Sequence, residues 1–87
     1  MTVTITLIGK PDCHLCDLAR EVIASVIQDA PGEAIDIREL SILDDPQLYE
    51  QWWQKIPVVL VGDRFHAHWR VDATRLRTAI EQAGENR

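Results

Sequence analysis

The chain has very few cysteines and no long apolar run. Among its 87 residues there are only Cys13 and Cys16, whereas a small secreted domain built on disulfides usually carries four or more. The unbroken aliphatic run Val58–Val61 falls far short of the roughly 18 apolar residues that cross a bilayer. The N-terminus also lacks a basic region followed by an apolar stretch and a cleavage site. A disulfide scaffold is therefore excluded, and no membrane partner, no secretion and a cytoplasmic location are expected.

Positive charge is also sparse. Nine Lys and Arg residues are scattered along a chain of net charge -5, and no basic cluster offers the electrostatic footprint of nucleic-acid binding. We therefore expect no nucleic-acid partner. The sequence shows no repeat, linker or low-complexity segment, and its length suits one core. We expect a single domain over residues 1–87.

Apolar periodicity predicts the secondary structure. Four segments show the alternation or the apolar runs of strands: residues 2–8, 34–40, 58–61 and 64–70. A helix is expected over residues 13–29, because apolar residues recur there at spacings of three and four. Two further helices are expected to begin at Asp45-Pro46 and after Asp72, because Asp is a good N-cap and Pro suits the first helical position.

These elements follow one another in the order β-α-β-α-β-β-α. A long helix between the first two strands makes them parallel, with a right-handed crossover. The tight turn Gly62-Asp63 joins the last two strands into an antiparallel hairpin. The expected architecture is an α/β domain with a four-stranded mixed sheet and helices on both faces.

The two cysteines form a C-x-x-C motif between the first strand and the first helix. Cys13 is expected at the helix N-terminus, where free N–H groups and the helix dipole favour a thiolate and lower its pKa. Cys16, one turn later, begins the row of residues that faces the core. We therefore expect Cys13 to be exposed and to attack a disulfide, and Cys16 to be shielded and to resolve the mixed disulfide.

Three neighbours are candidates for tuning the pKa of Cys13. Lys10 and a protonated His14 would stabilise the thiolate, whereas Asp12 would oppose it. The sequence does not decide the balance between them.

Other functions for the cysteines stay open at this stage. Both residues are also compatible with a structural role. A zinc site would need four ligands, which His14, His66 and His68 would have to complete without a second C-x-x-C or H-x(3–5)-H element. Haem attachment is excluded because Asp17, not histidine, follows Cys16. No metal site is predicted.

The chain resembles the glutaredoxin-like proteins of the thioredoxin superfamily, specifically a short group with a C-H-L-C motif. The resemblance rests on Cys13-His14-Leu15-Cys16-Asp17 after Pro11, on Asp45-Pro46 followed by Leu48-Tyr49, and on Ile56-Pro57-Val58. It covers nearly the whole chain. It implies a thioredoxin fold and thiol-disulfide oxidoreductase activity.

The resemblance also implies a substrate groove. A cis peptide before Pro57 would leave the backbone of Ile56 free to pair with an extended peptide or with glutathione. The alternative is an ordinary proline at the start of a strand, but the resemblance favours the cis form. His14 would border the same groove, and Asp72, at the start of the last helix, would meet the amine of glutathione.

Two departures from typical glutaredoxins stand out. The usual Cys-Pro-Tyr-Cys is replaced by C-H-L-C, and the Gly-Gly pair before the last helix is absent. Trp69 and Arg70 stand in that region. The resemblance therefore predicts thiol chemistry more firmly than it predicts the use of glutathione.

The leading hypothesis is an oxidoreductase that cycles between dithiol and disulfide without a bound cofactor. Its expected substrates are protein or low-molecular-weight disulfides, with glutathione as a co-substrate or a reductase as the electron donor. A monomer is expected. The alternative is a thioredoxin-fold binding module that holds a metal or iron-sulfur centre, or docks on a partner, with little turnover.

Overall fold

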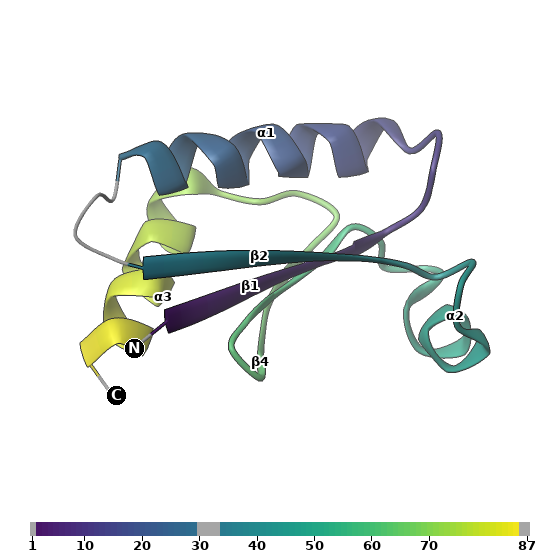
Figure 1. Ribbon diagram of the computed structural model, residues 1–87. Helices are drawn as coiled ribbons and strands as arrows, with labels where there is room; N and C mark the ends of the chain where they lie inside the picture. The colour runs from purple at the N-terminus through teal and green to yellow at the C-terminus, as the bar shows by residue number, and fades with distance from the viewer. Residues whose placement is uncertain (1, 30–33, 86–87) are drawn as a thin grey trace.

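A computed structural model describes residues 2–29 and 34–85. The elements follow in the predicted order (Figure 1). The strands are β1 (Thr2–Gly9), β2 (Ala34–Ser41), β3 (Val58–Val61) and β4 (Arg64–His68). The helices are α1 (His14–Gln28), α2 (Pro46–Trp52) and α3 (Ala73–Glu85).

The strands form one four-stranded sheet in the order β2-β1-β3-β4. β1 pairs with β2 in parallel, and Val3 lies opposite Ile35. β3 runs antiparallel to both β1 and β4, so that Val58 lies between Ile8 and His68. The structure therefore confirms the mixed sheet, the parallel first pair and the C-terminal hairpin, whose turn residue Gly62 has a φ of 61° that glycine adopts without steric cost.

One face of the sheet carries the main core. Figure 1 shows α1 running along β1 and β2, with α3 beside the end of α1 where that helix finishes. Alternate residues of the central strands point to this face because side chains alternate along a strand. Its buried apolar residues come from β1, α1, β3 and α3: Val3, Ile5, Leu7, Ala19, Ile23, Val26, Val59, Val61, Leu76 and Ile80.

The opposite face is covered by α2 at one end. Ile8, Ile42 and Val58 form a second buried cluster there. Trp52 packs against this cluster, whereas its neighbour Trp53 is half exposed. The helix begins as predicted, since the Asp45 carboxylate accepts a hydrogen bond of 2.9 Å from the Gln47 N–H. Helices thus lie on both faces of the sheet.

The last strand is shorter than the alternation predicts. β4 ends at His68, and Trp69 has a φ of 63°, which turns the chain out of the extended conformation. The pairing of β3 with β4 also contains an irregularity between Val59 and Leu60. Local alternation does not reveal either feature, because an alternating pattern marks neither a positive φ nor an irregular strand pair.

Register places several chain segments at one end of the sheet. β1 and β2 both finish there, and α2 lies beyond this end in Figure 1. Because β3 is antiparallel to β1, it starts at the same end, immediately after Pro57. β4 also finishes there, just before Trp69. The helix α1 begins at this end, so the cysteines, Pro57 and Trp69 belong to one region.

None of the helices in residues 2–29 and 34–85 combines the length and the apolar character that crossing a membrane requires.

Candidate redox-active site

A tight turn connects β1 to α1 and presents the first cysteine. Asp12 has a φ of 58°, a left-handed conformation that Asp tolerates better than most residues. Cys13 then takes the N-cap position of α1 with an extended backbone. The sequence expectation that Cys13 lies at the helix N-terminus is confirmed, with the helix itself beginning at His14.

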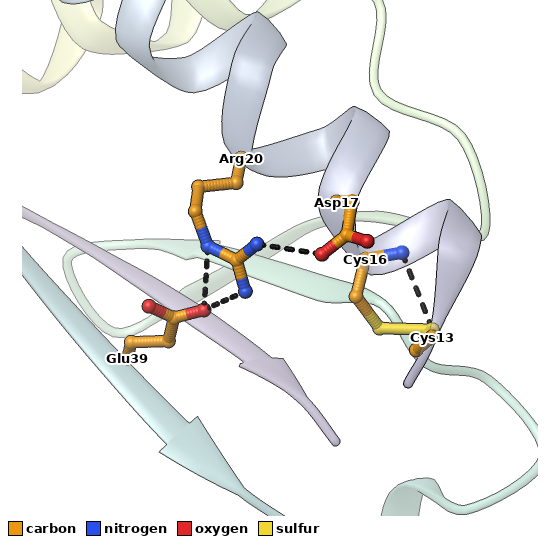
Figure 2. Close-up of a disulfide and its surroundings, with 5 residues drawn as sticks. All are labelled: Cys13, Cys16, Asp17, Arg20 and Glu39. Carbon is orange, nitrogen blue, oxygen red and sulfur yellow. Dashed lines mark hydrogen bonds and ion pairs between the residues drawn. A yellow bond between two sulfur atoms is a disulfide. The ribbon is translucent and has the colours of Figure 1, made fainter. Parts of the chain in front are cut away.

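Cys13 and Cys16 are joined by a disulfide, and their Cα atoms lie 5.2 Å apart (Figure 2). The two residues differ in their surroundings. Cys16 is only 1 % exposed, whereas Cys13 is partly exposed. A nucleophile from another molecule would therefore meet Cys13 first.

The first turn of α1 provides a hydrogen bond to the outer sulfur. The Cys16 N–H donates to the Sγ of Cys13 at a distance of 3.2 Å. This N–H is one of the unpaired donors at a helix N-terminus, and such donors stabilise a negative charge. When the disulfide is reduced, the same geometry would favour a thiolate on Cys13.

Gly9 is a site residue that the sequence alone marks only as a glycine following the first strand pattern. It ends β1 directly beneath the inner cysteine. A Cβ atom on Gly9 would lie 2.7 Å from the Sγ of Cys16 and 3.3 Å from its Cβ. The absence of a side chain at Gly9 therefore creates the space that the buried sulfur occupies.

Gly9→Ala should destabilise the oxidised protein by about 1–3 kcal/mol, the usual cost of forcing extra atoms into a packed core. Urea unfolding of the two oxidised proteins measures the difference. In a Cys16→Ala background the sulfur is gone, so the same substitution should cost less. An equal cost in both backgrounds would show that the contact with the sulfur is not the cause.

Charged side chains tie the start of α1 to β2. The Arg20 guanidinium binds Asp17 at 2.8 Å within the helix and also binds Glu39 of β2 (Figure 2). Hydrogen bonds to Glu39 and then to Asp17 raise the pKa of Arg20 above its ordinary value. All three groups are about half exposed or more, so the network orients the helix more than it stabilises the fold.

The Ile56–Pro57 peptide bond is cis. Pro57 is buried and Ile56 is partly buried. The Pro57 carbonyl accepts a hydrogen bond of 2.9 Å from the Trp69 N–H. Within the described residues, by contrast, neither backbone polar group of Ile56 has a hydrogen-bond partner.

The other predicted site residues are distributed around the cysteines. Lys10, Asp12 and His14 are exposed, and in the part of the chain that the structure describes their side chains form no hydrogen bond or ion pair. They flank Cys13 in sequence, and their effect on its pKa stays a prediction. Asp72 caps α3, as predicted: its carboxylate accepts from the Arg75 N–H at 2.8 Å.

The cap role of Asp72 can be separated from its predicted role in binding glutathione. Asp72→Ala should lower the free energy of unfolding by about 0.5–2 kcal/mol because a helix cap is lost. Asp72→Asn keeps a capping oxygen and should restore most of that stability, which thermal or urea unfolding will show. If the Asn variant is as unstable as the Ala variant, capping is not what Asp72 contributes.

The histidines do not assemble with the cysteines. Within residues 2–29 and 34–85, no group of three or more His, Cys, Asp or Glu side chains is arranged to hold a metal ion. His66 lies beside α3 instead, where burial, followed by the charge of Arg75, lowers its pKa. The described donor set of this chain therefore does not supply the ligands that a tetrahedral zinc site requires.

Comparison with known proteins places this geometry in a family. Residues 4–81 match the family model described as "Glutaredoxin-like domain (DUF836)". The chain is 27 % identical over 81 residues to the uncharacterised protein Rv0508 of Mycobacterium tuberculosis, an alignment that covers 91 % of this chain and 84 % of the relative.

Solved structures show the same likeness. The X-ray structure of the structural-genomics target XcR50 from X. campestris is 31 % identical, with a TM-score of 0.73 and coverage of 90 % of this chain and 96 % of that one. Chloroplastic thioredoxin z has the same TM-score of 0.73 at 15 % identity, covering 97 % of this chain and 80 % of that one, which shows the thioredoxin fold alone. The C-x-x-C disulfide at the start of α1, the sheet that supports it and the match over most of the chain lead to one conclusion: this protein has a thioredoxin fold and belongs to the glutaredoxin-like (DUF836) family.

Proposed function

We propose that the protein is a thiol-disulfide oxidoreductase in which Cys13 is the nucleophile and Cys16 the resolving thiol. The observation that carries the proposal is the asymmetry of the disulfide. The Sγ of Cys13 accepts an N–H from the helix terminus and the residue is partly exposed, whereas Cys16 is buried against Gly9. A pair that served only as a structural crosslink would not need this difference.

The proposed reaction consists of two thiol exchanges. The Cys13 thiolate attacks one sulfur of a substrate disulfide, which forms a mixed disulfide and releases the other sulfur as a thiolate that takes a proton from water. The Cys16 thiol then loses its proton and attacks the Sγ of Cys13. The second substrate thiol leaves, and the Cys13–Cys16 disulfide remains. Two electrons have passed to the substrate, and an external thiol pair must restore the dithiol.

Substrate binding is proposed to involve Ile56, Pro57 and His14. The unpaired backbone groups of Ile56 support this, because an extended chain could pair with them as a peptide pairs with a sheet edge. The proposed substrates are protein or low-molecular-weight disulfides, and the proposed electron donor is glutathione or a reductase. A monomer in the reducing cytoplasm fits a chain with two cysteines.

Turnover of a glutathione mixed disulfide, with glutathione and its reductase supplied, tests the proposal. If glutathione is the donor, we expect the wild-type protein to reduce the mixed disulfide. The Cys13→Ser/Cys16→Ser double variant should show no such reduction. If this assay fails, the same measurement with dithiothreitol as the donor and a protein disulfide as the substrate separates donor choice from chemistry. No exchange with either donor would overturn the proposal.

A further inference from the structure

A cavity of about 250 Å³ lies between the N-terminal half of α1 and the segment that joins β4 to α3. Its apolar lining comes from both sides: Leu15, Leu18, Ala19, Val22, Trp69 and Val71. Leu15 belongs to the C-x-x-C motif itself, so the cavity reaches the first turn of α1, whose N-cap is Cys13. A group bound there would belong to the molecule that Cys13 attacks.

Trp69 is the wall of this cavity on the side opposite α1. Its backbone has a φ of 63°, a conformation in which glycine is favoured and a bulky side chain is uncommon. The indole is nevertheless fixed: Nε1 donates to the Gln54 carbonyl at 2.9 Å, and the ring lies 4.6 Å from that of His68. Trp69 remains 53 % exposed, so its free surface is available to another molecule.

The cavity lining also carries one charge of each sign, Glu21 and Arg70. Within the described residues neither side chain forms an ion pair. These opposite charges give no net preference for an acidic or a basic group. The six apolar lining residues favour an apolar group, because its burial removes apolar surface from water. An uncharged apolar side chain is the occupant that the lining favours.

We propose that Trp69 is a specificity-determining residue, and that it and α1 form a pocket for an apolar side chain next to the cysteine of a polypeptide disulfide. This inference rests on the proposed oxidoreductase function and names its substrate class. The occupant is an extended segment, because the unpaired backbone of Ile56 and the pocket lie in the same region as Cys13 and one chain can engage all three. A small disulfide has no side chain to reach the pocket.

The assignment is tested with two peptide disulfide substrates of equal length. One has Leu next to its cysteine, and the other has Asp at the same position. Wild-type protein should reduce the Leu peptide with a kcat/KM roughly tenfold or more above that for the Asp peptide, as expected for burial of one apolar side chain. Trp69→Gly, which suits the backbone conformation, should bring this ratio close to one. Equal wild-type rates for the two peptides would overturn the proposal.

Two more variants serve as controls, one in the opposite wall of the pocket and one outside it. Leu18→Asn changes the opposite wall of the pocket, at a residue that is 39 % exposed, and should also reduce the ratio. Trp53→Ala removes a similarly exposed tryptophan (50 %) at the C-cap of α2, outside the pocket, and should leave the ratio unchanged. If wild-type protein reduces neither peptide, and no protein disulfide with dithiothreitol as the donor, the proposed function itself fails. If it reduces both peptides at equal rates, only the pocket assignment is wrong.

Discussion

Cys13→Ser is expected to lower the rate of disulfide exchange by a thousandfold or more, on the order seen when an enzyme loses its covalent nucleophile. A serine hydroxyl stays protonated at neutral pH and cannot form a mixed disulfide. The remaining Cys16 cannot take over, because it is 1 % exposed and packed against Gly9. The initial rate with a protein disulfide under dithiothreitol measures the loss.

The control for this variant is a comparison of its folding stability with that of the reduced wild-type protein. Cys13 contributes a side-chain acceptor to the Cys16 N–H, and serine is a good N-cap that preserves this bond. Reduced wild-type protein and the Cys13→Ser variant should therefore have similar unfolding midpoints. A folded variant that keeps more than about a tenth of the activity would show that Cys13 is not the nucleophile.

Cys16→Ser is expected to stop the reaction halfway. Cys13 still attacks, but no second thiol is positioned to release the substrate, so a covalent complex of protein and substrate accumulates. The structure accounts for this because the first turn of α1 holds Cys16 with its Cα only 5.2 Å from that of Cys13. The complex should appear on a non-reducing gel as one protein bound to one substrate.

Dithiothreitol should release the substrate from this complex, and Cys13→Ser should form no such complex. The pair of variants therefore separates attack from resolution. If Cys16→Ser traps nothing while Cys13→Ser does, the two roles are reversed.

Much of the fold follows from local pattern. The alternation in β1 and the three-and-four spacing in α1 are long enough to define each element, and the helix between two strands requires a parallel pair. The position of Cys13 at the helix start follows from Gly9 and Pro11, which break the strand before the helical pattern begins. The burial of Cys16 follows from its place on the apolar face of α1.

The remaining features depend on contacts between distant segments. Gly9 appears in the sequence as a simple strand breaker, and only the packing of α1 on β1 shows that it makes room for a sulfur. The sequence pattern places Trp69 in an alternating strand, yet the residue lies just after β4 and its Nε1 donates a hydrogen bond to the Gln54 carbonyl. Nothing in the sequence around Glu39 indicates a contact with α1, although Glu39 of β2 forms an ion pair with Arg20 of that helix. No periodicity encodes such long-range contacts.

The central claim is that Cys13 and Cys16 form a redox pair. The most direct test equilibrates the protein in mixtures of reduced and oxidised glutathione and then counts its accessible thiols. After alkylation, mass spectrometry should show protein with both cysteines alkylated or neither, in one reversible transition. In fully reduced protein, brief alkylation should modify Cys13 well before the buried Cys16. Cysteines that oxidise independently, that never oxidise, or that alkylate in the reverse order would contradict a redox pair with Cys13 as its nucleophile.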